Sequence, residues 1–552
     1  MVVPELRPWR AARPHVTRFV NAVRPRLARA TDAVRPGLTR AADAVRPSLA
    51  RTAAAVKPQV TRVRRAVEPQ LARIPWPKPV GPWRYTAVAT TAGLALAATV
   101  AMAAGPWDSS GQRTAERDRV TALEQPGGAD HGGSGTSAQG PRPAPSAPSV
   151  LAGLGGSVGS PQPAPTGRAL GAVLEPLLGE AALGTRRTAA VVDVATGKRL
   201  FGAGADAGQT PASTTKLATA VAALSALGPD HRLTTRVALE PDTKELVLVG
   251  GGDPTLTASE DPGEWASLRE LAADTASALK KRGITKVTLS YDTSLYAGSQ
   301  MHPIGVNDNL APVSPLMNDE GRTDGSTSGT ALRVSDPAAA ATQLFAKLLA
   351  LQNITTSSPG PSKATARAQT LAEVSSPPLS ALVERMLTNS DNDIAEALAR
   401  QTAVATKERA DFEGAGKAIR TQLRKLGIPL TGTAFHDGSG LDRADRLTAD
   451  TLTALLVKAG SADHPELRAV LTGLPVAGFT GTLASRYTDG AAGVVRAKTG
   501  TLTGVNTLAG TVVDQDGRLL AFAFMAGGTT SAPAAQAALD GAATALAGCG
   551  CR

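Results

Sequence analysis

Cysteine is almost absent from this sequence. Among its 552 residues only Cys549 and Cys551 are cysteines, and both stand at the C-terminal end. With no other thiol in the chain, a disulfide framework and a cysteine-ligated zinc site are excluded. The C-x-C tail itself is open to three interpretations: a strained disulfide, a fragment of a metal site, or no functional role.

Aromatic residues are also scarce, at 3% of the chain against 42% for all hydrophobic residues. The apolar content predicts a globular part, and its core must be built from aliphatic and small side chains. A chain of this length is typically divided into roughly three or four structural units.

Acidic residues are rare in the first 85 residues, which hold 18 Lys and Arg but only 4 Asp and Glu. The whole chain carries a net charge of +11, yet residues 86–552 are slightly acidic. The basic character therefore belongs to an N-terminal arm, 1–85, and nucleic-acid binding is not expected of the remainder.

The arm is built from an 11-residue repeat that begins with stretches such as "VRPRLARATDA" and "VRPGLTRAADA". Eleven residues make about three helical turns, which would place Val, Leu and Ala on one face. The proline in each repeat interrupts helical hydrogen bonding. Two interpretations remain: short amphipathic segments that bind anionic lipid headgroups, or a disordered basic tail.

Residues 86–105, "TAVATTAGLALAATVAMAAG", carry no charge and are long enough to cross a bilayer. Because the arginine excess precedes this segment, we expect an uncleaved single-pass anchor with a cytoplasmic N-terminus and an extracellular C-terminal part. The alternatives are a buried helix and a cleaved signal with Ala101-Met102-Ala103 as its cleavage site. Residues 106–167 are rich in Pro, Gly and Ser, which predicts a linker.

The globular part is expected over residues 168–552. Its first and last thirds favour strands and its middle favours helices, which predicts one α+β domain whose sheet joins both ends of the region. Residues from about 235 to 365 contain a strand, helix and strand pattern. They predict an inserted α/β subdomain.

Three short motifs stand in order along this region. They are Ser213-Thr-Thr-Lys216, Ser390-Asp-Asn392, and Lys498-Thr499-Gly500 followed by Thr501. Each alone is typical of an ordinary helix cap, loop or turn. In this order they match a catalytic set with a serine nucleophile.

The chemistry of the set is consistent. A serine hydroxyl needs a base within hydrogen-bond reach, and a lysine three residues later on a helix shares its face. Burial or a neighbouring cation can lower the pKa of Lys216 enough for it to act as that base. Backbone N–H groups at a helix start also favour an oxyanion. Ser390 can relay a proton, Asn392 can bind a substrate amide, and Lys498 with Thr499 can hold a carboxylate.

The sequence resembles the penicillin-binding proteins of the low-molecular-mass D-alanyl-D-alanine carboxypeptidase/endopeptidase type (class C). The resemblance covers about residues 168–548. It includes "GQTPASTTKLATA", "LVLVGGGDPTL", "LTNSDNDIAEAL", "HDGSGLDR", "LPVAGFTGTL" and "VRAKTGTLTGV". It implies a penicillin-binding/β-lactamase-like transpeptidase fold with a domain inserted between the first two motifs.

The resemblance also implies roles. Ser213 forms the acyl-enzyme, Lys216 is its base, and Ser390 and Asn392 line the cleft. Lys498, Thr499 and Gly500 form the side that binds the terminal carboxylate, and the backbone N–H groups of Ser213 and Thr501 form the oxyanion hole. The implied substrates are peptidoglycan stem peptides ending in D-Ala-D-Ala, with β-lactams as acylating inhibitors. No metal or cofactor is expected.

Two alternatives stay open. A β-lactamase-like hydrolase would need a glutamate near an asparagine after the second motif, and residues 393–497 contain no asparagine. A non-catalytic wall-binding or sensor protein could keep the fold, although the intact motifs argue against it. The sequence leaves undecided whether the enzyme removes a terminal D-Ala or cuts cross-links.

Overall fold

The computed structural model describes residues 165–552, apart from 488–489 and 551–552. The predicted arm and anchor, and the linker up to residue 164, lie outside the described residues, as does Cys551. Within the described part of the chain, no helix is both long and apolar enough to span a bilayer.

A five-stranded sheet joins the two ends of the described chain. Its strand order is β2-β1-β10-β9-β8, and every neighbouring pair is antiparallel. The strands are β1 (Arg186–Asp193), β2 (Arg199–Ala203), β8 (Arg496–Leu502), β9 (Val505–Val513) and β10 (Leu519–Gly527). The expectation of an α+β domain whose sheet joins both ends of the globular region is thus confirmed.

Both faces of this sheet are buried, and the side chains of successive residues point to opposite faces. On β10, Phe522 and Phe524 pack with one apolar cluster, whereas Ala521 and Ala523 pack with another. The period of two follows from strand geometry. The phenylalanines face α4 (Gly167–Leu178) and α13 (Ala532–Ala547), and the alanines let the helices of the other layer approach closely.

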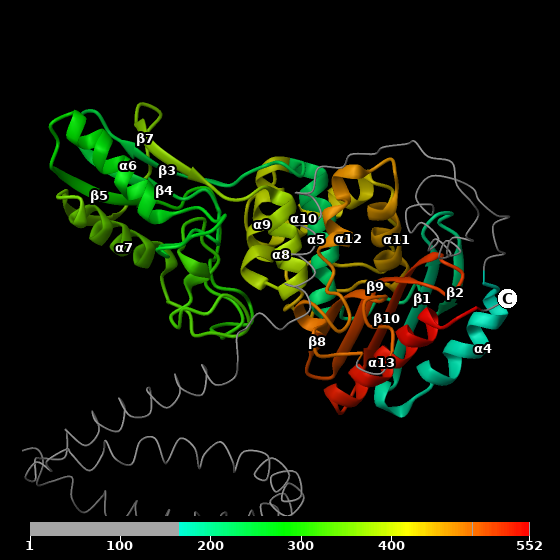
Figure 1. The fold of residues 1–552 in the computed structure, drawn as a ribbon. Coiled ribbons are helices and arrows are strands. Elements are labelled where there is room, and N and C mark those ends of the chain that lie inside the picture. The colour runs from blue at the N-terminus through cyan, green and yellow to red at the C-terminus, as the bar shows by residue number, and fades with distance from the viewer. Residues whose placement is uncertain (1–164, 488–489, 551–552) are drawn as a thin grey trace, which may run out of the picture. The chain divides into compact units, whose positions relative to one another are not determined.

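A group of helices lies on that second face, beside the strands in Figure 1. It comprises α5 (Thr215–Leu227), α8 (Leu379–Asn389), α9 (Asn392–Thr406), α10 (Phe412–Lys425), α11 (Ala449–Gly460) and α12 (Ala469–Thr472). Side-chain oxygens cap several of these helices, as Asp411 does for α10 and Thr448 for α11. Such caps satisfy backbone N–H groups that the helix itself leaves unpaired.

A second five-stranded sheet interrupts the helical group in the sequence, with the order β6-β5-β4-β3-β7. Its elements are β3 (Thr234–Leu239), β4 (Glu245–Val249), α6 (Leu268–Lys281), β5 (Lys286–Asp292), α7 (Pro337–Leu351), β6 (Thr355–Pro361) and β7 (Gln369–Ser375). The pairs β4–β5 and β5–β6 are parallel, and helices α6 and α7 connect them. Parallel neighbours require such crossovers.

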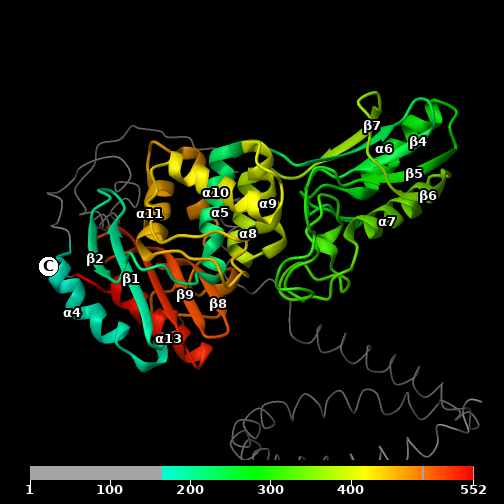
Figure 2. The same cartoon turned by 180° about the vertical axis from the view of Figure 1, so that it is seen from behind.

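This inserted part has its own apolar core, made by the second sheet with α6 and α7. Seen from both sides, the helical group stands between the two sheets (Figures 1 and 2). The long segment 293–336, between β5 and α7, runs back onto the helical group, and its contacts reach the motifs described next.

Candidate active site

Ser213 lies in a single 3-10 turn, Ala212–Thr214, directly before α5. The α-helix begins at Thr215, after Ser213 as expected. Ala212 has a left-handed backbone, with φ of 49°, which costs energy in a residue that is not glycine. The Thr214 hydroxyl and the Thr507 hydroxyl both donate to the Pro211 carbonyl, so the surrounding structure holds this turn.

Lys216 reaches the nucleophile from the first turn of α5. Its Nζ lies 3.1 Å from Ser213 Oγ, 2.7 Å from Asn392 Oδ1 and 2.7 Å from the Ser439 carbonyl oxygen. The residue is fully buried. The structure therefore brings the predicted base and the predicted nucleophile together, and adds a carbonyl contact from a distant loop.

Burial lowers the pKa of Lys216 to about 8, because an ammonium group loses solvation away from water. Nearby carboxyl groups oppose this effect and keep the pKa from falling further. They belong to Asp437, Glu396, Asp391 and Asp393. A lysine with such a pKa supplies a useful fraction of neutral amine near neutral pH.

The second motif forms the junction between α8 and α9. Ser390 ends α8 in a left-handed conformation with φ of 58°, and Asp391 caps α9 by accepting from Ile394 N–H. This sharp turn directs the two flanking side chains toward the cleft. Asn392 binds Lys216 through Oδ1 and donates from Nδ2 to the Asn309 carbonyl of the inserted segment at 2.9 Å.

The third motif lies on β8 and faces the second. Lys498 is fully buried, and its Nζ contacts Ser390 Oγ at 2.9 Å. Burial, together with the charge of Lys216, lowers the pKa of Lys498 well below its usual value. The Lys498 side-chain nitrogen thus contacts the Ser390 hydroxyl, while the Thr499 hydroxyl donates to Thr482 Oγ1 at 2.9 Å.

Gly500 has a steric reason to be glycine. A Cβ at this position would lie 2.1 Å from Thr507 Oγ1 and 2.7 Å from the Pro211 carbonyl oxygen. Those atoms hold the turn that carries Ser213. The third motif therefore approaches the turn of Ser213 closely through its backbone, which only a glycine allows.

A cavity of about 460 Å³ opens at this junction. The motif residues Ser213, Ser390, Asp391, Asn392, Thr499 and Thr501 line it, together with residues outside the motifs. These are Asn309, Arg322, Ser328, Gly329, Thr330, Arg333, Asn389, Leu441, Thr482, Ser485, Arg486 and Gln536. Several come from the inserted segment, so that segment forms one wall of the cleft.

Sequence reasoning did not assign a role to the stretch "HDGSGLDR", although two glycines beside polar residues are a signal of a tight functional turn. Within it, the Ser439 carbonyl accepts from Lys216 and the Gly438 carbonyl accepts from Thr219 Oγ1 at 2.6 Å. Glu396 of α9 accepts from the N–H groups of Gly438 and Ser439. The turn is therefore tied to α5 and α9.

Two buried groups in the described part of the chain have ligand atoms within 4.8 Å of one another: His302, Glu396 and Asp437, and Glu320, Asp391 and Asp393. The first group already binds N–H and hydroxyl donors, and arginines pair with Glu320 and Asp393 of the second. We assign no metal to either.

The fold and the site combine a serine hydroxyl and a buried lysine amine, in contact at 3.1 Å, with a two-sheet α+β scaffold and an inserted domain, an arrangement typical of serine hydrolases of the acyl-transfer class. Residues 170–328 and 320–547 match the family model described as the D-Ala-D-Ala carboxypeptidase 3 (S13) family. The chain therefore belongs to the S13 family and is a serine D-Ala-D-Ala carboxypeptidase.

Relatives support this assignment. The chain is 38% identical over 404 residues to carboxypeptidase DacB of Mycolicibacterium smegmatis, covering 70% of this chain and 86% of the relative. It is 36% identical over 438 residues to carboxypeptidase Rv3627c of Mycobacterium tuberculosis, covering 76% and 92%. Among solved structures, penicillin-binding protein 4 from Haemophilus influenzae has a TM-score of 0.56 at 22% identity, covering 68% of this chain and 97% of that chain. That last comparison concerns the fold alone.

Proposed function

We propose that Ser213 and Lys216 carry out acyl transfer at the D-alanyl carbonyl of a peptidoglycan stem peptide. The arrangement around Lys216 Nζ carries this proposal. A neutral amine has two hydrogens and one lone pair. Its two acceptors, Ser439 O and Asn392 Oδ1, take the hydrogens, which leaves the lone pair for the Ser213 hydroxyl.

The reaction then has two balanced halves. Ser213 Oγ attacks the carbonyl carbon while its proton passes to Lys216 Nζ. Collapse of the tetrahedral intermediate breaks the peptide bond, and the proton held by Lys216 passes through the Ser390 hydroxyl to the leaving amine. Water then attacks the ester carbonyl while one of its protons passes to the neutral Lys216. Cleavage of the ester bond releases the shortened peptide, and Lys216 returns the proton to Ser213 Oγ.

The remaining motif residues bind the substrate in this proposal. The backbone N–H groups of Ser213 and Thr501 stabilise the oxyanion, Asn392 holds the substrate amide, and Lys498 with Thr499 attracts the terminal carboxylate. The contact between Lys498 and Ser390 supports a second role for Lys498, which is to orient the relay hydroxyl.

A β-lactam would acylate the same serine. Because residues 393–497 contain no asparagine, the asparagine-glutamate pair that a β-lactamase would use to activate the deacylating water is missing, which favours a long-lived adduct over β-lactamase turnover.

Product analysis tests the reaction. With purified full-length protein, we expect one equivalent of free D-Ala from each monomeric pentapeptide, measured by mass spectrometry of defined muropeptides. Conversion of cross-linked dimers into monomers would demonstrate that the enzyme also has endopeptidase activity. A folded protein that binds these peptides but releases no D-Ala would contradict the carboxypeptidase assignment.

We also infer that residues 86–105 anchor the enzyme in the cell membrane, with the basic arm on the cytoplasmic side and the catalytic domain outside. The uncharged segment, its preceding arginine excess and the extracellular location of peptidoglycan support this topology.

Cell fractionation and protease protection test the topology. The full chain should sediment with membranes. External protease should remove the catalytic domain from intact spheroplasts, while a tag at residue 1 stays protected. Degradation of that tag would contradict the orientation.

A further inference from the structure

His302 comes from the inserted part of the chain, yet its imidazole is buried in the catalytic part. The residue lies in segment 293–336, is 2% exposed, and packs edge-on against Phe412 of α10 at a ring distance of 5.1 Å. Arg400 of α9 donates to the carbonyls of Ala297 and Ser299, just before His302. The segment is thereby attached to the helical group just before His302 and at the imidazole ring itself.

The hydrogen bonds of His302 determine which nitrogen carries the proton. Nδ1 accepts from Ile304 N–H at 3.2 Å, so it has no hydrogen of its own. Nε2 therefore carries the hydrogen and donates it to Asp437 Oδ2 at 3.0 Å. Both ring nitrogens are used, and the imidazole has one defined orientation.

Asp437 organises the turn that follows it. Its carboxylate accepts from Gly440 N–H and Asp442 N–H, each at 2.7 Å, and from Ser439 Oγ at 3.2 Å. Burial alone would raise the pKa of Asp437, but hydrogen bonding with His302, with the neighbouring Asp445 carboxyl and with Gly440 N–H holds it at about 2. The group is ionised throughout the physiological range and binds donors from three residues of the turn.

The same turn supplies the Ser439 carbonyl that accepts from Lys216. It also lies against the turn of the nucleophile, because a Cβ on Gly440 would be only 1.9 Å from the Ala212 carbonyl oxygen. A displacement of the turn would therefore alter the positions of both Lys216 and Ser213.

We propose that His302 is a positioning residue for the catalytic lysine: through Asp437 it fixes the turn whose Ser439 carbonyl orients the amine of Lys216. The inserted domain thus contributes to the base of the reaction in addition to forming a wall of the cleft. The inference rests on the proposed role of Lys216, and it assigns His302 no contact with substrate.

Several carboxyl groups surround His302 and Lys216 and influence the pKa of Lys216 that a pH profile of acylation would measure. The carboxyl groups of Glu396, Asp437 and Asp442 face His302, and Lys216 is surrounded by the four carboxyl groups named above. An ammonium form of Lys216 gains more from the Ser439 carbonyl than the neutral amine does. Loss of that contact should lower the pKa of Lys216 and make its lone pair less well directed.

Two substitutions separate the hydrogen bond from the volume of the ring. His302→Gln keeps an N–H donor near the position of Nε2, whereas His302→Leu fills similar space without a donor. The second-order rate constant of acylation by a fluorescent penicillin is measured from pH 6 to 10 for wild type and both variants. We expect His302→Leu to react about tenfold more slowly, with the rising limb of its pH profile displaced to lower pH, and His302→Gln to stay within about threefold of wild type.

The outcomes are separable. If the wild type itself is not acylated, the proposed function fails, not this inference alone. If the wild type reacts and His302→Leu matches it in rate and profile, His302 does not position the lysine. Equal loss in both variants without a shift of the profile, or failure of both to fold by circular dichroism, would make the residue purely structural and would overturn the proposal.

Discussion

Replacing Ser213 by alanine should eliminate covalent labelling by a fluorescent penicillin and reduce D-Ala release by about 10⁴-fold or more. The alanine removes the only atom that forms the ester, and it leaves the turn Ala212–Thr214 otherwise intact. Ser213 Oγ has Lys216 as its partner, so its loss leaves a buried amine with two other acceptors still in place. Gel fluorescence after denaturation and a D-Ala assay measure both effects.

The matched control is Ser225→Ala, which removes a serine hydroxyl near the C-terminal end of the same helix, α5. This variant should label at the wild-type rate. Labelling of the Ser213→Ala protein that survives denaturation would place the nucleophile elsewhere. In that event the enzyme would still belong to its family, but the proposed mechanism would be wrong.

Replacing Lys216 by methionine should slow acylation by about 10³-fold, within the range that a general base contributes. Methionine keeps the length and apolar stem of the side chain, so the fully buried site remains filled. Some slow labelling should persist, because Ser213 and the oxyanion donors are unchanged. The rate of penicillin acylation under pseudo-first-order conditions gives the measurement.

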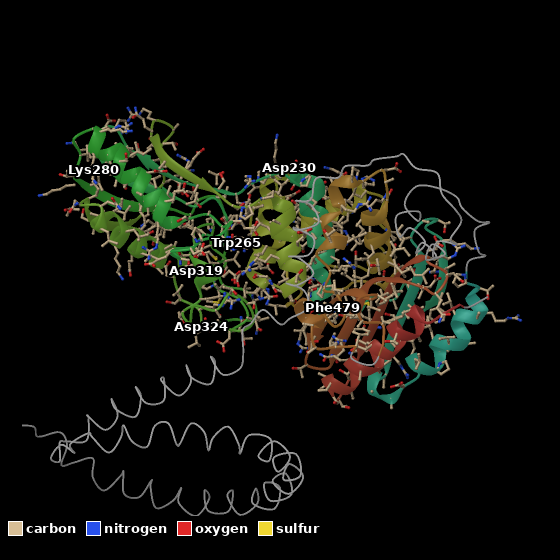
Figure 3. All side chains as sticks on the ribbon, in the orientation of Figure 1. Asp230, Trp265, Lys280, Asp319, Asp324 and Phe479 are labelled. Carbon is tan, nitrogen blue, oxygen red and sulfur yellow. The ribbon has the colours of Figure 1, made fainter. Side chains whose placement is uncertain are left out.

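The pH profile adds a second readout for the same residue. In the proposed mechanism the neutral amine is the base, and burial lowers the pKa of Lys216 to about 8. Acylation by wild type should therefore rise about tenfold per pH unit below that value and level off above it. The acylation rate of Lys216→Met should no longer rise with pH over this range. The control variant Lys280→Met, at the exposed end of α6 (Figure 3), should keep both the wild-type acylation rate and its rise with pH.

A wild-type profile that stays flat between pH 6 and 9 would assign the base to another group. A Lys216→Met protein whose acylation rate is reduced but still rises with pH would also assign the base to another group. Either result would leave the nucleophile prediction intact, since that prediction depends on Oγ alone.

Local patterns were sufficient for several features of this protein. The spacing of Ser213 and Lys216 predicted their contact, because residues three apart in a helical turn face the same side. Short apolar runs bounded by glycine-containing turns predicted the strands at both ends of the globular region, and the sheet joins them. The order of the three motifs indicated a common cleft, and Ser213, Ser390, Asn392, Thr499 and Thr501 line it.

Other details were not indicated by local patterns. A helix was expected after Ser213, and the α-helix begins at Thr215; the 3-10 turn Ala212–Thr214 that precedes it was not foreseen. The left-handed backbone of Ala212 is held by the close approach of Gly440 and Gly500. Since both glycines are more than 200 residues away in the sequence, no local propensity could indicate their effect.

Residue types and short-range spacing were enough to indicate the proposed nucleophile, its proposed base and the chemistry they could perform, because those properties depend on one helical turn. Only the tertiary structure placed the Ser439 carbonyl on Lys216, Lys498 against Ser390, and His302 of the inserted segment on Asp437. Those contacts join residues separated by 108 to 223 positions. They exist because packing of two sheets and a helical group brings distant backbone segments together, which no pattern within one segment encodes.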